Sequence, residues 1–203
     1  MIFFLRAKHW QLFILFFGIP MMFELLMLFN LLTNMMHNPD PASAFNSFKF
    51  FSVIMFFCTG TLFGWFWAVA TWLQKLVPAN VKMKVGKFKV FFFIPLVYLI
   101  CICFFVFSVM PGFATGNVNN IAPFAFMFAI IFPVHLFSMF CIFYCLYFVA
   151  KTIKTVELQR EVSFADFAGE FFLSWFFFVG VWILQPRINK LADQLTEQPA
   201  EEA

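Results

Sequence analysis

Residues 88–110 read FKVFFFIPLVYLICICFFVFSVM, and this stretch is long and apolar enough to cross a lipid bilayer as a single helix. Its one charged residue, Lys89, lies beside its start. Three other stretches share this character: residues 10–33, 50–76 and 123–150. Because a helix needs about 20 apolar residues to cross roughly 30 Å of hydrocarbon, the sequence predicts four full membrane spans.

The composition supports the same fold class. Of the 203 residues, 64% are hydrophobic, 11% are charged and 38 are phenylalanine, whereas soluble domains contain roughly 25% charged residues. The loops between the predicted spans are too short to form a soluble catalytic domain. We therefore expect residues 1–203 to form one all-α domain, a polytopic transmembrane helical bundle in the lipid bilayer.

Basic residues alternate along the chain in the manner of an oriented membrane protein. They precede the first span, cluster between the second and third, and follow the fourth: Arg6, Lys8, Lys75, Lys82, Lys84, Lys87, Lys89, Lys151, Lys154 and Arg160. The loop after the first span has only Lys49, and the loop after the third has no charge. The positive-inside rule predicts a cytoplasmic N-terminus, and this orientation explains the net charge of +3 without a nucleic-acid partner.

The C-terminal quarter has a different pattern. Residues 151–161 are polar and predict a helical extension of the fourth span, and Ser163 with Asp166 predicts a capping box that starts a new helix. We expect a membrane-associated helix over residues 164–184, followed by an acidic tail over 191–203. Its apolar part is short for a crossing, which favours a re-entrant course over a fifth span.

Two ionisable residues lie deep inside predicted spans. Glu24 in the first span and His135 in the fourth have similar predicted depths from the same membrane face. Titratable groups at such depths are costly and usually face the interior of a bundle. We therefore expect Glu24 and His135 to form an intramembrane polar pair, either as a structural bridge or as a proton or solute site.

Small residues and prolines predict how the spans pack. Gly60, Gly64 and Ala68 recur every four residues and form one face of the second span, where a neighbouring helix can approach closely. We expect this face to be a packing seam, within the chain or between two copies. Three spans also contain a proline that removes a backbone hydrogen bond and favours a kink: Pro20, Pro95 and Pro133.

The start of the C-terminal helix is a candidate docking surface. Asp166 and Glu170 lie one turn apart, near the positive N-terminal end of that helix. With Arg187, they are expected to form an ordered cytoplasmic ledge that packs against the lysine-rich loop and binds a protein partner. A solvated helix start without a partner is the alternative interpretation.

Motifs for catalysis or cofactor binding were not found in the sequence. The five cysteines all lie in predicted spans, where small reduced core residues are the simplest interpretation. The histidines have no metal-binding spacing, and there is no phosphate-binding loop or paired nucleophile and base. We expect no cofactor and no metal, and an enzyme is disfavoured.

The C-terminal region resembles a known group of proteins. The stretches that carry the resemblance are VELQRE at 156–161, GEFF at 169–172, WFF at 175–177 and QPRIN at 185–189. They are similar to the C-terminal region of small bacterial inner-membrane proteins without an assigned function. The resemblance implies the bacterial inner membrane and no particular activity. This chain has Phe178 where the group would have proline. Without that proline, we do not expect a sharp break inside the segment.

Two functions remain open from the sequence. The first is a non-enzymatic membrane subunit or accessory protein that docks a protein partner, or a second copy, through its cytoplasmic C-terminal region. The alternative is a small transporter or channel-like protein that uses Glu24 and His135.

Overall fold

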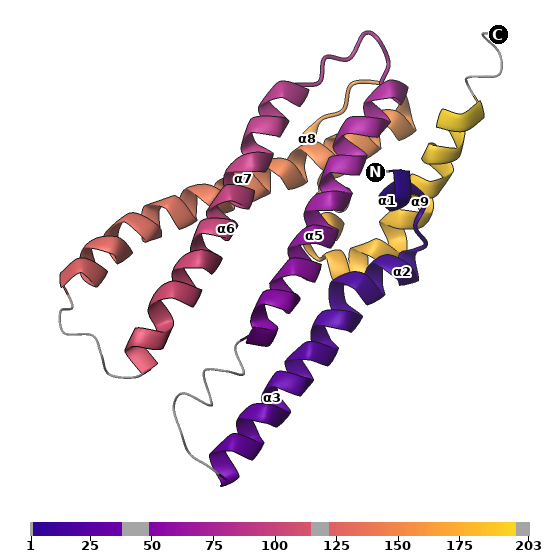
Figure 1. Cartoon of the computed structure of the whole chain (residues 1–203). Helices are drawn as coiled ribbons and strands as arrows, with labels where there is room; N and C mark the ends of the chain where they lie inside the picture. The colour runs from indigo at the N-terminus through magenta and orange to yellow at the C-terminus, as the bar shows by residue number, and fades with distance from the viewer. Residues whose placement is uncertain (1, 38–48, 115–121, 198–203) are drawn as a thin grey trace.

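The structure is a computed structural model that describes the backbone of residues 2–37, 49–114 and 122–197 (Figure 1). All regular structure in these three ranges is helical. The first span consists of α2 (His9–Phe13), a π-helical turn (Ile14–Gly18) and α3 (Ile19–His37), and the second is α5 (Lys49–Trp72) with a 3-10 turn (Leu73–Leu76). The third and fourth are α6 (Val85–Ala114) and α7 (Ala122–Leu158).

Each of these four segments is long and apolar enough to cross a membrane. The predicted all-α membrane bundle with four spans is therefore confirmed. Helix α7 continues to Leu158, because the polar residues that follow Ala150 extend the helix beyond the apolar run. The second span is the central one: 39% of its apolar stretch is buried, against 11% in the first.

The prolines disturb the helices less than their number suggests. Helices α6 and α7 continue through Pro95 and Pro133. Pro20 lies two residues after the π-helical turn, and because proline has no N–H, it cannot donate to the carbonyl of Phe16 one turn earlier. The thiol of Cys58 on α5 donates a hydrogen bond to this carbonyl at 3.4 Å, so a neighbouring helix replaces the missing donor.

The C-terminal segment forms two helices, α8 (Phe164–Trp175) and α9 (Phe177–Glu197), with a break at Phe176. The expectation of one helix over 164–184 without a sharp break was therefore wrong, and the acidic tail expected from residue 191 is helical to Glu197. Glycine permits the break. A Cβ on Gly180 would lie 1.8 Å from the carbonyl oxygen of Leu173, so only glycine lets the start of α9 fold back onto the backbone of α8.

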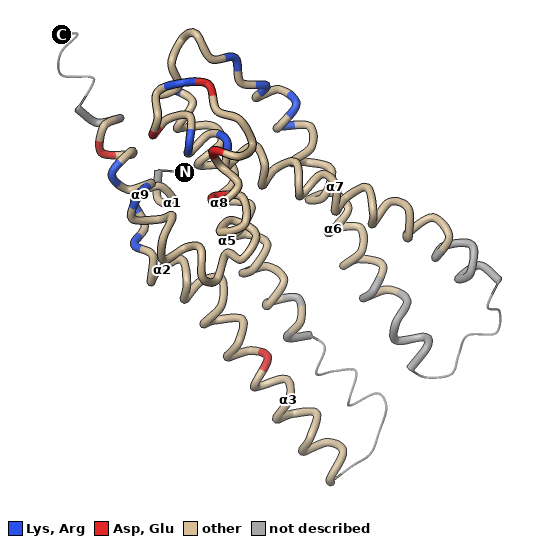
Figure 2. The backbone as a smooth tube through the Cα atoms, turned by 180° about the vertical axis from the view of Figure 1, so that it is seen from behind, with Lys and Arg blue, Asp and Glu red and all other residues tan. Residues whose placement is uncertain are grey.

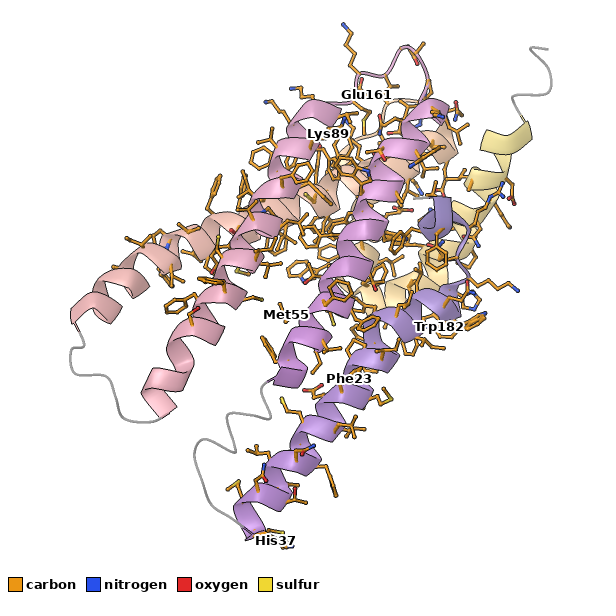
Figure 3. The ribbon with its side chains drawn as sticks, in the orientation of Figure 1. Phe23, His37, Met55, Lys89, Glu161 and Trp182 are labelled. Carbon is orange, nitrogen blue, oxygen red and sulfur yellow. The ribbon has the colours of Figure 1, made fainter. Side chains whose placement is uncertain are left out.

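The two C-terminal helices form a hairpin that returns to one end of the bundle (Figure 1). Arg187 on α9 contacts Glu170 on α8 and Glu157 near the end of α7. The same end carries the short N-terminal helix α1 (Ile2–Arg6), which packs on α5 and α9. Figure 3 shows Lys89 and Glu161 towards this end and His37 at the opposite end. The end of α7 and both helices of the hairpin thus meet at this end of the bundle, and a re-entrant course through the membrane stays a prediction.

The hydrophobic core lies at the end of the bundle that carries α1 and the C-terminal hairpin. Its largest fully buried apolar side chains come from α1, from all four spans and from both helices of the hairpin: Leu5, Leu12, Trp65, Phe66, Leu73, Phe88, Ile153, Phe167, Leu184 and Ile188. Figure 2 shows the lysines and arginines gathered at this same end. The distal parts of α3, α6 and α7 expose large apolar side chains to the surroundings, as lipid-facing helices do.

Candidate functional site

The predicted intramembrane pair of Glu24 and His135 does not form in the structure. Glu24 is exposed on α3, which packs mainly against α5, whereas His135 is on α7. Helix α3 and the first half of α7 lie on opposite sides of the bundle in both backbone views (Figures 1 and 2). The structure therefore does not bring Glu24 and His135 together.

His135 has a different partner. Its Nδ1 atom lies 2.9 Å from the hydroxyl of Tyr98 on α6, within hydrogen-bond distance. Equal depth from the membrane face is thus not enough to pair two residues, because the order of helices around the bundle decides which spans are neighbours. Tyr98 escaped notice in the sequence because a tyrosine in an aromatic-rich span has no distinguishing signal.

The three small residues on one face of α5, Gly60, Gly64 and Ala68, lie in three different environments. Ala68 is fully buried in the core. At Gly64, a Cβ would lie 2.5 Å from the ring of Phe4, so the N-terminal helix α1 packs directly against this glycine. A Cβ added at Gly60 would meet nothing within 4 Å, and Gly60 lines a groove of about 450 Å³ between α5 and α6. The predicted seam is therefore intramolecular at Gly64 and Ala68 and open at Gly60.

Asp166 caps α8 as the sequence predicted. Its carboxylate accepts hydrogen bonds from the backbone N–H of Ser163 at 2.8 Å and from the Ser163 hydroxyl at 2.9 Å. Arg160 forms an ion pair with the same carboxylate at 3.0 Å. These interactions, first of all the backbone hydrogen bond, hold the pKa of Asp166 below its ordinary value. The role of Asp166 in this structure is to start a helix.

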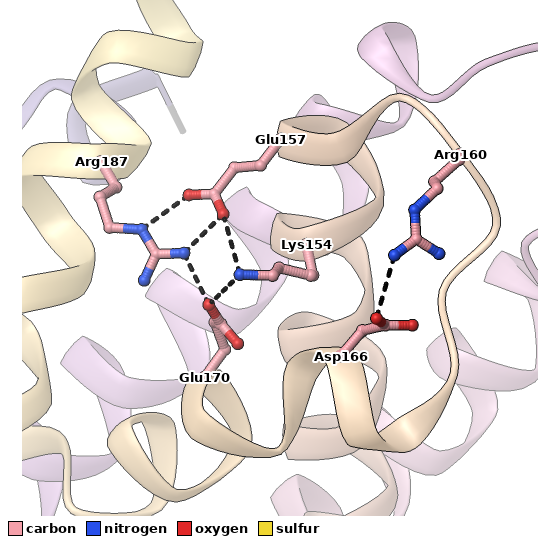
Figure 4. Close-up of polar contacts among 6 residues, drawn as sticks. All are labelled: Lys154, Glu157, Arg160, Asp166, Glu170 and Arg187. Carbon is pink, nitrogen blue, oxygen red and sulfur yellow. Dashed lines mark hydrogen bonds and ion pairs between the residues drawn. The ribbon is translucent and has the colours of Figure 1, made fainter.

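Glu170 is not part of an exposed ledge. Only 5% of its surface is accessible, and its carboxylate oxygen Oε1 binds Arg187 at 2.6 Å and Lys154 at 3.1 Å (Figure 4). The expected packing of Glu170 against the loop that contains Lys82 was wrong. The turn at Phe176 brings Arg187 back over α8, so the carboxylate is neutralised from within the C-terminal region.

Arg187 joins three helices in a cluster of two cations and two carboxylates (Figure 4). Its Nε atom donates to Glu157 Oε1 at 2.7 Å, and its terminal nitrogen donates to Glu157 Oε2 at 2.5 Å and to Glu170. Lys154 lies 3.8 Å from Glu157 and completes the charge balance. We call these four residues, Lys154, Glu157, Glu170 and Arg187, the ionic cluster.

Contacts within the ionic cluster shift the pKa values of Glu170 and Arg187. Burial raises the pKa of Glu170, but hydrogen bonds from Arg187 and Lys154 outweigh burial, so the net shift is downward. Hydrogen bonds to Glu157 and Glu170 raise the pKa of Arg187 further above its ordinary value. Glu170 and Arg187 are therefore both charged at neutral pH.

A second polar contact fixes the N-terminus to α9. The side chain of Gln185 is fully buried, and its amide nitrogen lies 2.9 Å from the carbonyl oxygens of both Phe4 and Ala7. The indole N–H of Trp65 donates to its amide oxygen at 2.8 Å. Asn189, one turn later, also donates to Ala7, at 3.3 Å. These bonds supply donors to carbonyls at the end of α1, which a helix that stops at Arg6 leaves open.

The segment QPRIN at 185–189 thus joins the polar contacts of α1 and α5 to the ionic cluster. Gln185 holds α1 and α5, Arg187 holds α7 and α8, and Ile188 is fully buried in the core. Gln185, Lys154 and Glu157 were not among the site residues predicted from the sequence. The signal available was their position: strongly polar residues at the ends of apolar segments, where a helical hairpin needs polar partners.

No family model, no curated protein and no solved structure matches this chain.

Proposed function

We propose that this protein is a non-enzymatic subunit or accessory protein of a membrane complex in the bacterial inner membrane. The resemblance of its C-terminal region to small inner-membrane proteins supports this location. The gathering of lysines and arginines at one end supports a cytoplasmic position for that end and for the N-terminus (Figure 2).

The observation that carries this proposal is the exposure of Glu24. It lies near the middle of the first span, His9–His37, on a helix whose apolar stretch is only 11% buried. Ionisable residues in spans almost always face protein or water, because contact with hydrocarbon is costly. Glu24 is exposed in its own bundle, so a second protein surface is the environment that we propose lowers this cost.

The docking surface is therefore proposed to be the exposed face of α3. The C-terminal ledge suits a partner less well, because Glu170 is buried and Arg187 is bound to two carboxylates. The hairpin instead supports the bundle as a rigid base. The alternative function, transport through a joint Glu24 and His135 site, finds no support because these residues lie on separate sides of the bundle.

Copurification tests the proposal. The full chain is purified in mild detergent, and stoichiometric partners, including a second copy, are identified by mass spectrometry. Glu24→Leu should abolish recovery of the partner. Asn30→Leu is the matched control on α3, since the Asn30 side chain bonds to the carbonyl of Leu26 in its own helix at 3.0 Å. Full recovery of the partner with Glu24→Leu, or a monomer without partners in the wild type, would contradict the proposal.

A further inference from the structure

A pocket lined by lysines lies between the start of α6 and the C-terminal half of α7. Its volume is about 280 Å³, and the side chains that give it its polar character are Lys82, Lys84, Lys87, Lys151, Tyr144 and Tyr147. The lysines come from two segments that are far apart in the sequence. Folding, rather than a continuous basic run, therefore concentrates the charge.

The lysines of this pocket have no acidic partners in the part of the chain that the structure describes. Ion pairs with carboxylates are made instead by Lys154, Arg160 and Arg187, none of which lines the pocket. Four ammonium groups around one small pocket repel each other, and a bound anion relieves this repulsion. The start of α6 adds the partial positive charge of a helix N-terminus beside Lys84.

The position of the pocket indicates where the anion comes from. Lys82 and Lys84 directly precede the third span, which begins at Val85, and Lys151 directly follows the apolar run of α7 that ends at Ala150. The pocket therefore lies at the level where the spans leave the hydrocarbon, which is where phospholipid headgroups lie. Tyrosines are also typical of this level.

The surface next to the pocket suits acyl chains. On α7, Phe140 and Leu136 lie at helical spacing from Tyr147 and share its face. All three are exposed, with accessible fractions of 58%, 51% and 37%. An apolar strip therefore runs from the lysine pocket towards the middle of the fourth span.

We propose that this pocket binds the phosphate-bearing headgroup of an anionic phospholipid, whose acyl chains lie along the exposed strip of α7. The lysine ammonium groups and the tyrosine hydroxyls donate to the phosphate oxygens. Basic pockets between membrane helices recognise anionic headgroups in this way. This inference goes beyond the proposed subunit role and concerns a different face of the bundle.

Native mass spectrometry of the full chain tests the lipid site. Protein in mild detergent is titrated with phosphatidylglycerol, with phosphatidylcholine and with soluble glycerol 3-phosphate. We expect phosphatidylglycerol to remain bound in preference to phosphatidylcholine, with affinity that falls as salt is added, because salt screens exposed charges. Binding of glycerol 3-phosphate as tightly as phosphatidylglycerol would assign the pocket to a soluble phosphate and overturn the lipid proposal.

Paired variants separate the pocket from general charge. The double variant Lys84→Gln and Lys87→Gln should weaken phosphatidylglycerol binding by at least about tenfold. The control, Lys8→Gln with Lys190→Gln, removes the same charge from exposed positions outside the pocket and should leave binding unchanged. Lys84→Arg with Lys87→Arg should retain binding. Equal losses in the pocket and control variants, or wild-type binding that does not respond to salt, would overturn the proposal.

Discussion

Arg187 holds both carboxylate oxygens of Glu157, with Nε–Oε1 and Nη2–Oε2 distances of 2.7 and 2.5 Å (Figure 4). The two parallel hydrogen bonds define the orientation as well as the distance between α7 and α9. Since Glu170 uses the same guanidinium, the end of the fourth span and both arms of the hairpin are held at one point.

Removal of Arg187 should destabilise the C-terminal region. Arg187→Ala leaves the buried carboxylate of Glu170 and the partly buried carboxylate of Glu157 without their main partner, and loss of a hydrogen bond to a charged group costs about 1.5–3 kcal/mol. Thermal unfolding in detergent, followed by circular dichroism, measures the change. Lys190→Ala, at an exposed position of the same helix, should shift stability by less than about 0.5 kcal/mol. Equal stability of the two variants would contradict a role for the ionic cluster.

Gln185 should control the attachment of the N-terminal helix. Gln185→Leu fills a similar volume but leaves the Trp65 indole and the carbonyls of Phe4 and Ala7 without this hydrogen-bond partner. Each buried group left unsatisfied lowers the free energy of unfolding by about 1–3 kcal/mol. Hydrogen exchange should then increase in residues 2–8. The control is Gln194→Leu at an exposed position of α9. Unchanged protection of residues 2–8 in Gln185→Leu would contradict the assignment.

Two glycines in the hairpin should respond oppositely to alanine. Gly180→Ala places a Cβ against the Leu173 carbonyl and should destabilise by at least roughly 1–3 kcal/mol, because the backbone must move. At Gly169 on α8 an added Cβ meets nothing within 4 Å, so Gly169→Ala should stabilise the protein by up to about 1 kcal/mol through the higher helix propensity of alanine. Comparison of the two melting temperatures checks this difference, and a stable Gly180→Ala variant would exclude the close approach.

Acid should weaken the hairpin. The pKa of Glu170 in the folded protein lies below its ordinary value of 4.5. Its contribution to the free energy of unfolding is therefore present above pH 4.5 and is lost as the pH falls through the lower, folded value. Asp166 contributes with the same sign. Glu170→Gln should reduce the fall in stability between pH about 6 and pH about 3. A pH dependence equal to that of the wild type would separate Glu170 from this effect.

The hairpin should place residue 190 on the same side of the membrane as the lysine pocket. Single cysteines replace Lys84, Lys190 and His37 in a chain from which the five native cysteines are removed, with serine at Cys58 to keep its hydrogen bond to Phe16. An impermeant thiol reagent should label positions 84 and 190 from one side and position 37 from the other. Labelling of position 190 together with position 37 would show that the hairpin crosses the membrane.

The features that could be predicted from the sequence are those that depend only on residues close together in the chain. The four spans follow from the lengths of apolar runs, and the start of α8 follows from the spacing of Ser163 and Asp166, whose hydrogen bonds the structure contains. Both signals act within a few turns of helix, so no knowledge of the packing is needed. The break at Phe176 was not predicted, since it is visible only in the fold, where Gly180 permits the close approach of α9 to the Leu173 carbonyl.

The sequence by itself determined a membrane bundle of four apolar spans. It also determined that the basic residues concentrate before the first span, between the second and third, and after the fourth. Both follow from the sequence because hydrophobic length and charge are properties of the chain. Only the tertiary structure decided which polar groups meet: His135 binds Tyr98 rather than Glu24, and Glu170 is buried against Arg187. The physical reason is that these spans are apolar on every side, so their sequences do not indicate which face turns inward. Helix order and rotation come from the packing of side chains in three dimensions.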